Sequence, residues 1–353
     1  MRMIEDFGGK GEVSFQRQGV AGIITLHRPE ALNALTYVML LAIEKALRAW
    51  ENDPGIERVI IVGQGRAFSA GGDIVEIYKA GRAGNPPFGF FADEYRTNAY
   101  IERYSKPIVS MYNGIVMGGG AGISVHGSHR VFSENAGFAM PEVGIGFFPD
   151  VGGSYFLPRL PDEYGLYMAL TGRRVGWGDA LKTGLATQAV AASDFPKAVE
   201  ALSKSGATDE ILAQFSVLPQ PETGSKDFAD IATWFSANAL PHLVECVSLA
   251  AENSNSFAAG VLKNLRRNSP TSLSIAFRQI RTGAELSMEE CMAMEFRIVS
   301  RMLVGHDFYE GIRAAVIDKD RNPQWKPVSL DAINPADIDG YFAPLGEKEL
   351  TIP

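Results

Sequence analysis

The sequence predicts an α/β fold that continues into a mostly helical region. Two strand-like runs, residues 13–18 and 22–26, open the chain, and a short apolar strand at 59–62 follows an amphipathic helix. The alternation of helices with short strands recurs up to about residue 190, and such alternation is typical of α/β folds. Beyond that point the strand signals fade. We therefore place an α/β core in residues 1–190 and a helical region in residues 191–353.

The first two strands are expected to form a hairpin, because Gly19 lies between them. A helix should then begin at Thr36, whose hydroxyl can cap it, and end near Glu51, before the turn residues 52–55. The apolar positions that repeat at helical spacing, and that we expect to be buried, are Val38, Leu41, Ala42, Ala46 and Ala49.

A second segment repeats this order of elements. We expect a helix at 92–104, a buried strand at 107–111 and a turn entering a helix at 118–125. Two further short strands are expected at 130–133 and 136–139.

The helical region is interrupted by a Pro-rich break at residues 216–225. Farther on, Ser287 with Glu290 and Asp307 with Glu310 have the spacing of capping boxes. Each pair therefore predicts the start of a helix.

The composition is that of an ordinary soluble globular protein, with 21% charged and 46% hydrophobic residues among 353. The net charge of −8 disfavours nucleic acid or an anionic membrane as the main partner. Cys246 and Cys291 give neither a disulfide framework nor a metal spacing, which is typical of a reducing compartment. The N-terminal stretch lacks an apolar signal core, and no apolar run has the length of a membrane span. We therefore expect a cytoplasmic protein.

Two neighbouring motifs carry the chemistry. The run MGGGAG, residues 117–122, offers backbone N–H groups with almost no side chains in the way, which is what a developing oxyanion needs. The stretch FAMPEVGIGFFPDVGG, residues 138–153, places Glu142 and Asp150 among apolar residues and glycines. A carboxyl is costly to bury, so it tends to persist in such surroundings where it has a function. Together the motifs predict acyl chemistry, with a polarised carbonyl beside an acid or base.

Both motifs also have purely structural interpretations. The glycine run could be a tight turn or a close helix contact. A dinucleotide site is disfavoured, because the third glycine of a GxGxxG pattern would fall on Ile123. Glu142 and Asp150 could be acids of a surface loop, but their apolar flanks argue against full exposure.

Two other signals are better explained by structure than by catalysis. His126 and His129 have no third ligand at a usual spacing, so a metal site is disfavoured. Ser124 lies in GISVH, which departs from the GxSxG elbow of serine hydrolases at its fifth residue.

The motifs FSAGGDI (68–74), MGGGAG and MPEVGIGFFPDVGG resemble those of the crotonase, or enoyl-CoA hydratase/isomerase, superfamily. The stretches HRPEALNAL, SVHGSHRV and VGHDFYEGIRAAVIDKDRNPQWKP are similar to the 3-hydroxyisobutyryl-CoA hydrolase family within it. This resemblance covers nearly the whole chain. It implies a crotonase-type spiral (ββα superhelix) whose helical region covers the acyl pocket. It also implies an acyl-CoA substrate, with no metal or redox cofactor beyond the CoA that the substrate carries. A homo-oligomer is left open.

The resemblance places an oxyanion hole at the backbone amides of Gly72 and Gly119, and the adenine part of CoA against the backbone of Ala70. Both glycines lack a Cβ that would obstruct a thioester oxygen. Two such donors could stabilise a transition state by roughly 3 kcal/mol each.

The resemblance also identifies acids. Glu142 and Asp150 fall on the carboxylates of the acyl site, and Glu94 on a further acid that contacts the substrate. The setting of Glu94, ADEYR, equally fits a solvated helix face, so this assignment depends on the resemblance.

One departure from the superfamily favours hydrolysis over hydration. Hydratases carry a first catalytic glutamate just after the glycine run, where this chain has Gly122, and usually a glycine where it has Asp150. Adding water across a double bond needs two positioned acid–base groups, whereas thioester hydrolysis can proceed with one carboxylate and an oxyanion hole. We therefore expect hydrolysis of a short 3-hydroxyacyl-CoA, with 3-hydroxyisobutyryl-CoA of valine breakdown favoured. Glu142 would be general base or nucleophile, and Asp150 would bind the substrate hydroxyl or orient the water.

Two alternatives remain. One is a hydratase or isomerase acting on a short-chain enoyl-CoA, which the missing glutamate disfavours. The other is a non-catalytic acyl-CoA-binding or scaffold protein, which would have no need for both acids.

Overall fold

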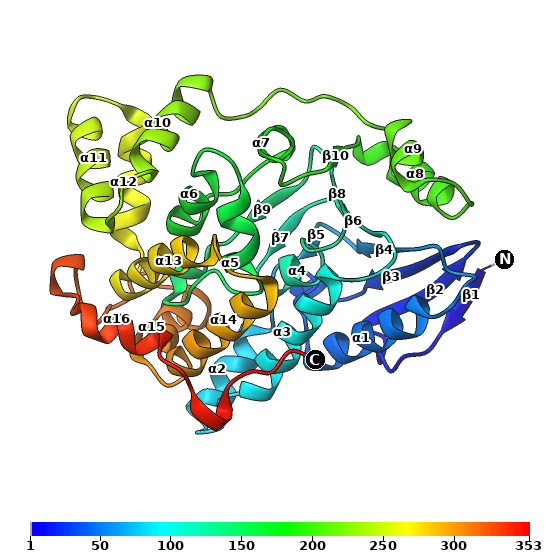
Figure 1. Ribbon diagram of the computed structural model, residues 1–353, viewed down its shortest axis with the longest axis horizontal. Helices are drawn as coiled ribbons and strands as arrows, with labels where there is room; N and C mark the ends of the chain where they lie inside the picture. The colour runs from blue at the N-terminus through cyan, green and yellow to red at the C-terminus, as the bar shows by residue number, and fades with distance from the viewer. Residues whose placement is uncertain (1) are drawn as a thin grey trace. The chain divides into compact units, whose positions relative to one another are not determined.

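The computed structural model describes residues 2–353, which group into two compact units that alternate along the chain. Unit 1 comprises residues up to 73, 93–138 and 175–222. Unit 2 comprises residues 74–92, 139–174 and 223–353. Every strand begins before residue 190, and the yellow-to-red part of the chain in Figure 1 is helical. The α/β class and the helical later region are thus confirmed, whereas the domain division at residue 190 stays a prediction.

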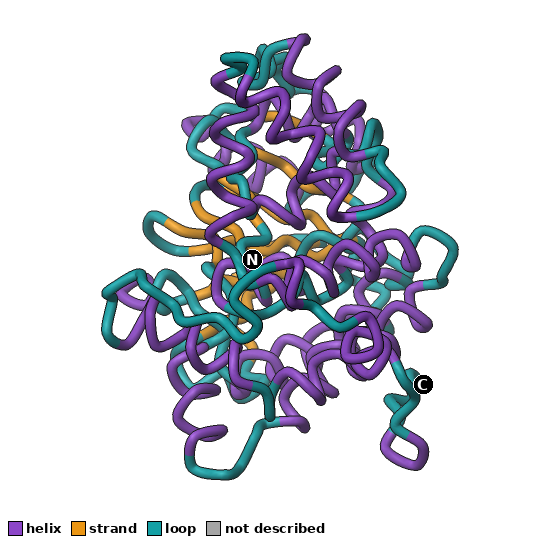
Figure 2. The backbone as a smooth tube through the Cα atoms, turned by 90° about the vertical axis from the view of Figure 1, so that its left-hand side faces the viewer, coloured by secondary structure: helices purple, strands orange, loops and turns teal. Residues whose placement is uncertain are grey.

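Two sheets contain all the strands of the described residues, drawn in orange in Figure 2. The strands are β1 (Arg2–Glu5), β2 (Val13–Gln18), β3 (Ala21–Leu26), β4 (Arg58–Gly63), β5 (Ala67–Ser69), β6 (Ile108–Tyr112), β7 (Ile115–Met117), β8 (His129–Phe132), β9 (Gly137–Ala139) and β10 (Gln188–Ala189). The larger sheet has the order β1-β2-β3-β4-β6-β8-β10, and the smaller β5-β7-β9. The predicted hairpin is β2–β3, and β1 adds a strand that the sequence analysis missed.

The larger sheet is antiparallel at its first three strands and parallel from β3 onward. Parallel neighbours require crossover connections, and helices supply them. The helices of unit 1 are α1 (Tyr37–Glu51), α4 (Gly119–Gly122), α7 (Trp177–Thr183), α8 (Phe195–Leu202) and α9 (Thr208–Ala213), and α3 (Phe88–Glu102) begins in unit 2 and continues into unit 1.

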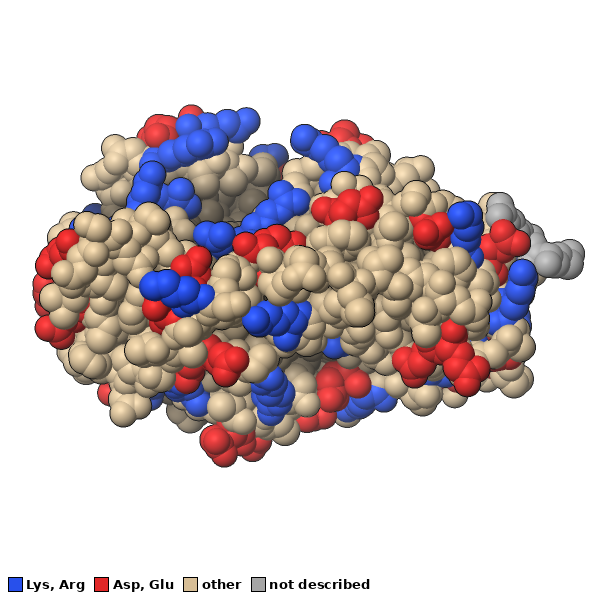
Figure 3. All heavy atoms as spheres, turned by 90° about the horizontal axis from the view of Figure 1, so that it is seen from above, with Lys and Arg blue, Asp and Glu red and all other residues tan. Residues whose placement is uncertain are grey.

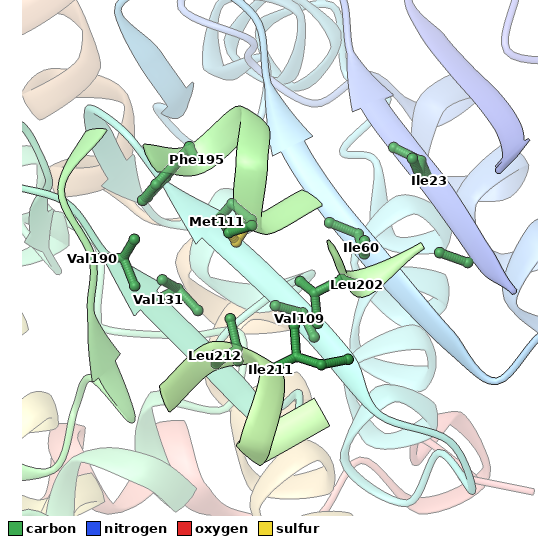
Figure 4. Close-up of a cluster of buried hydrophobic side chains, with 12 residues drawn as sticks. Ile23, Ile60, Val109, Met111, Val131, Val190, Phe195, Leu202, Ile211 and Leu212 are labelled. Atoms are coloured by element: carbon green, nitrogen blue, oxygen red, sulfur yellow. The ribbon is translucent and has the colours of Figure 1, made fainter. Parts of the chain in front are cut away.

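Helices α8 and α9 cover one face of this sheet. Ile60, Val109 and Val131, from three adjacent strands, point toward Leu202 of α8 and Leu212 of α9 (Figure 4). All five side chains are buried, and burying such a side chain contributes about 1.5–3 kcal/mol. This layer makes the parallel sheet a rigid support for the loops at the ends of its strands.

Helix α1 begins and ends as predicted, and the Thr36 side chain accepts a hydrogen bond from the N–H of Met39. Its buried face was predicted wrongly in part, because Leu41 and Ala49 are exposed. The helix has apolar residues on two sides. The larger side chains occupy most of the buried positions, because they bury more apolar area. The buried residues are Met39, Leu40, Ala42, Ile43, Ala46, Leu47 and Trp50.

Unit 2 is helical. Its helices are α2 (Ile74–Arg82), α5 (Gly153–Phe156), α6 (Tyr164–Thr171), α10 (Ser225–Phe235), α11 (Leu240–Glu252), α12 (Ser256–Arg267), α13 (Pro270–Gly283), α14 (Met288–Met302), α15 (His306–Ile312) and α16 (Pro335–Phe342).

One of the two predicted capping boxes is confirmed. Ser287 and Glu290 cap α14 reciprocally. The other is wrong, because α15 begins after Gly305 without a side-chain cap. The Asp307 carboxylate instead accepts hydrogen bonds from the Ser269 hydroxyl at 2.7 Å and from the Lys326 N–H at 2.8 Å. Tertiary partners thus take the acid that the local pattern assigned to a cap.

Candidate active site

In unit 1, two loops meet because the strands before them are parallel neighbours. Strand β5 runs parallel to β7, so the segments that follow the two strands leave the small sheet at the same edge. The loop after β5 contains Ala70 and Gly72, and the segment after β7 enters α4 at Gly119. The Ala70 N–H donates to the Leu32 carbonyl at 3.0 Å, which ties the first loop to the residues before α1.

The amides of Gly72 and Gly119 lie close together. A Cβ built on Gly119 would lie 3.4 Å from the Gly72 nitrogen, so only glycine leaves the space between them open. Gly71 has φ +110°, a backbone conformation that side chains rarely adopt, and it turns the loop toward Gly119. Within residues 2–353, neither the Gly72 N–H nor the Gly119 N–H has a hydrogen-bond acceptor. Both amides are therefore available as hydrogen-bond donors.

Glu94 of α3 is buried at 2% exposure, so the solvated alternative for this acid is excluded. One of its carboxylate oxygens would lie 2.6 Å from a Cβ on Gly119. Glu94 thus lies beside the two glycine amides, where an acid is close to any group that the amides bind.

In unit 2, Glu142 begins a one-turn 3-10 helix, Glu142–Ile145, which closes at Gly146. The side chain is 6% exposed, and no described residue forms a hydrogen bond with its Oε2 atom. Burial raises the pKa of Glu142 well above its ordinary value, and the negative charges of Asp150 and Glu295 raise it further. Carboxyls with a raised pKa are typical of general acids and bases.

Asp150 is also buried, at 4% exposure, and it is close enough to Glu142 for each charge to be felt by the other. It precedes two residues in the left-handed region, Val151 with φ +50° and Gly152 with φ +86°. The structure therefore brings together the two carboxyls that the sequence analysis singled out.

Sequence reasoning missed another buried acid, Glu295 of α14, which is 0% exposed. Burial raises the pKa of Glu295 to about 8. The two hydrogen bonds that its carboxylate accepts lower the pKa, but by less than burial raises it. A signal was available, because Glu295 occupies a position in the apolar stripe of its helix. The other residues of that stripe are Met288, Cys291, Met292, Ile298, Val299 and Met302.

The two signals set aside in the sequence have structural partners. The buried Ser124 hydroxyl donates to the Gly120 carbonyl at 2.6 Å and accepts from Tyr112. The His129 Nε2 atom lies 2.9 Å from a carboxylate oxygen of Asp209. Over residues 2–353, no group of three His, Cys, Asp or Glu side chains is arranged to hold a metal ion.

Known proteins share this combination of fold and motifs. The profile of the enoyl-CoA hydratase/isomerase family matches residues 21–342. The chain belongs to this family. A curated member, 3-hydroxyisobutyryl-CoA hydrolase, mitochondrial, of Xenopus tropicalis, is 43% identical over 364 residues, covering 100% of this chain and 94% of its own.

Two solved structures show the same fold over the whole chain. A carnitinyl-CoA dehydratase from Mycobacterium thermoresistibile has a TM-score of 0.90 and 37% identity, covering 97% of this chain and 98% of its own. An enoyl-CoA hydratase from Rhodobacter sphaeroides 2.4.1 has a TM-score of 0.87 and 40% identity, covering 96% and 99%. The predicted crotonase-type fold is thereby confirmed.

The expected cytoplasmic location is wrong. The curated 3-hydroxyisobutyryl-CoA hydrolases at about 40% identity are named as mitochondrial proteins. Our expectation came from the two unpaired cysteines and from an N-terminal stretch without an apolar signal core, and neither distinguishes one reducing compartment from another. No helix among residues 2–353 is long and apolar enough to cross a membrane.

Proposed function

We propose that this protein hydrolyses a short, branched 3-hydroxyacyl-CoA, 3-hydroxyisobutyryl-CoA, to 3-hydroxyisobutyrate and CoA in valine breakdown. The observation that carries the proposal is the buried pair Glu142 and Asp150, with Glu142 holding a raised pKa and an oxygen atom without a partner among the described residues. The full-length similarity to curated 3-hydroxyisobutyryl-CoA hydrolases supports it.

In the proposed mechanism, the thioester oxygen accepts hydrogen bonds from the Gly72 and Gly119 N–H groups. These donors stabilise the negative charge that develops when the carbonyl carbon is attacked, and one such donor is worth roughly 3 kcal/mol. Glu94, beside them in unit 1, contacts the acyl-CoA, and the Ala70 backbone contacts the adenine portion.

Glu142 has two possible roles. As general base it takes a proton from water, the water oxygen bonds to the carbonyl carbon, the C–S bond breaks, and Glu142 returns the proton to the CoA sulfur. As nucleophile it forms an acyl anhydride with loss of CoA, which water then hydrolyses. The raised pKa supports the first role, because a base works best when its pKa lies near the working pH.

Asp150 is proposed to accept a hydrogen bond from the 3-hydroxyl of the substrate. An ionised carboxylate can only accept, and a charge-assisted bond to a hydroxyl is strong and directional. The reaction needs only water and the thioester, so no metal or redox cofactor takes part.

A second candidate is hydration or dehydration of an acyl-CoA, because the two similar structures are of a carnitinyl-CoA dehydratase and an enoyl-CoA hydratase. Against it stands Gly122, the last residue of α4, where the sequence analysis placed the first hydratase glutamate. Of the two glutamates that hydratases use as acid and base, this chain therefore has only the second, Glu142.

A panel of acyl-CoA thioesters tests the proposal. Released free thiol would be measured for the 3-hydroxyisobutyryl, isobutyryl and longer-chain substrates side by side. We expect the highest kcat/KM for 3-hydroxyisobutyryl-CoA. If none of these substrates released free thiol, hydrolase function would be excluded.

A further inference from the structure

Glu295 holds the start of helix α5 with both oxygens of its carboxylate. One oxygen accepts from the Gly152 N–H and the other from the Ser154 N–H, each at 2.9 Å. All three residues belong to unit 2, but Glu295 is more than 140 positions away along the chain, so tertiary folding alone brings it there. Its side chain is fully buried, which makes the two bonds inaccessible to competing water.

The segment that Glu295 holds is the one that carries Asp150. Val151, which follows Asp150, has φ +50°, and a β-branched residue in that region is strained. Such a conformation persists only where the surrounding structure fixes it. On the other side of Asp150, the Gln279 side chain of α13 donates to the Pro149 carbonyl. Asp150 is thus held between two buried anchors, one before it and one after it.

The anchor is also electrically coupled to the acids. The charge of Asp150 raises the pKa of Glu295, after the larger effect of burial, and Glu295 in turn raises the pKa of Glu142. A further titratable group in electrostatic contact with Glu295 is Cys291, one turn earlier on α14, whose pKa burial raises. An ionised acid at this position therefore has a cost in burial that the two amide bonds reduce but do not cancel, because the pKa of Glu295 stays raised.

We propose that Glu295 is a positioning residue that fixes the Asp150 carboxyl through the Gly152 and Ser154 amides, so that Asp150 can select a 3-hydroxylated acyl group. This inference rests on the proposed function of Asp150. Glu295 does not contact the substrate in this account. It acts through the strained segment that it ties to α14.

The test uses Glu295→Gln with a matched control, Glu222→Gln. Glutamine keeps the shape but has one acceptor oxygen, so one of the two N–H groups loses its partner. Glu222 also accepts two N–H groups at a helix start, from Gly178 at 3.1 Å and Asp179 at 2.7 Å, but in unit 1. The control therefore disturbs the same kind of two-amide cap on a different helix, although Glu222 is exposed and Glu295 is buried.

The readout is the hydroxyl preference, the ratio of kcat/KM for 3-hydroxyisobutyryl-CoA to that for isobutyryl-CoA. We expect Glu295→Gln to lower this preference by roughly tenfold, the usual effect of misplacing one charged hydrogen bond. Glu222→Gln should change it by less than about twofold, because the helix that it caps, Trp177–Thr183, contains none of the proposed site residues. In an Asp150→Ala background, Glu295→Gln should have almost no further effect, because the group it positions is gone.

Each outcome separates the inference from the proposed function. If Asp150→Ala leaves the preference unchanged, the proposed role of Asp150 fails. If Asp150→Ala lowers the preference and Glu295→Gln does not, the positioning inference is overturned. A third outcome would also overturn the inference. If Glu295→Gln lowers kcat/KM equally for both substrates, and this loss multiplies with the loss caused by Asp150→Ala, the role of Glu295 is merely structural. If Glu295→Gln does not fold, Glu295→Asp is measured in its place. This variant keeps the carboxyl group on a shorter side chain, and the same results are expected.

Discussion

Glu142 lies in surroundings that make its ionisation costly, and this cost supports the role of base proposed for it. A carboxyl stabilised by exposure to water or by a nearby cation would be a weaker base, because its pKa would be low. In this chain burial, Asp150 and Glu295 all raise the pKa of Glu142.

The first prediction concerns this residue. Glu142→Gln preserves the shape of the side chain but removes both basicity and nucleophilicity. We expect kcat for thiol release to fall at least about a hundredfold, the lower range for acid–base groups, with little change in KM. Steady-state kinetics beside Glu222→Gln would check it, and near-normal turnover would remove Glu142 from the mechanism.

The second prediction concerns Asp150. If its carboxylate accepts the 3-hydroxyl, isobutyryl-CoA leaves a buried acceptor without a partner and should react roughly tenfold worse than 3-hydroxyisobutyryl-CoA. In Asp150→Ala that preference should shrink, because no buried carboxylate is left without a hydrogen-bond partner. Measuring kcat/KM for both substrates with both proteins decides the point. An unchanged ratio would mean that Asp150 acts only on the water or the leaving group.

At the scale of elements, the parallel pairing of β5 with β7 positions the two amides of the proposed oxyanion hole. The third prediction is that Gly119→Ala lowers kcat by roughly a hundredfold or more, the loss found when one oxyanion donor is removed. The added methyl would lie 2.6 Å from a carboxylate oxygen of Glu94 and 3.4 Å from the Gly72 nitrogen, so Glu94 would have to move and the space beside the two amides would be filled.

Gly260→Ala is the matched control for this change. Gly260 lies within helix α12, and a Cβ there would meet nothing within 4 Å. The control should keep its activity and gain stability of up to about 1 kcal/mol, because alanine favours a helix. Full activity in Gly119→Ala would show that the Gly119 N–H is not an oxyanion donor.

Local signals predicted many of the elements, and tertiary competition explains the misses. The Thr36 cap and the Ser287 box depend on neighbouring residues alone, and both were read correctly from the sequence. Asp307 has the same local pattern, but Ser269 and Lys326 take its carboxylate. Glu295 was missed because an acid inside a helix is usually solvated, and its partners lie far away along the chain.

The candidate site was predicted from motifs, and the structure adds the grouping within each unit. Gly72, Gly119 and Glu94 lie together in unit 1, and Glu142 and Asp150 in unit 2. The roles assigned to these residues came from a resemblance, and they stay predictions until the variants are measured.

At the scale of the whole molecule, charge is distributed rather than concentrated on the face drawn in Figure 3, where Lys and Arg side chains are interspersed with Asp and Glu. Two acids with raised pKa values, Glu142 and Glu295, are instead buried. A buried carboxyl whose pKa is raised binds its proton more tightly in the folded chain than in the unfolded chain.

The fourth prediction follows from this linkage. Between the ordinary pKa of 4.5 and the folded value of about 8, Glu295 holds more protons in the folded state than in the unfolded state. The free energy of unfolding should therefore fall as the pH rises through that window, by at most about 1.4 kcal/mol per pH unit for one proton. Urea unfolding across the window should show a shallower fall for Glu295→Gln. A slope that is identical in the two proteins would contradict the assignment of a raised pKa to Glu295.

The central claim is that this member of the enoyl-CoA hydratase/isomerase family hydrolyses a thioester rather than hydrating a double bond. The most direct test assays one preparation of the wild-type protein on two substrates. Free thiol released from 3-hydroxyisobutyryl-CoA is followed beside loss of the enoyl absorbance of crotonyl-CoA. Because Gly122 supplies no acid, the account predicts rapid thiol release and negligible hydration. Substantial hydration of crotonyl-CoA without thiol release from 3-hydroxyisobutyryl-CoA would contradict it.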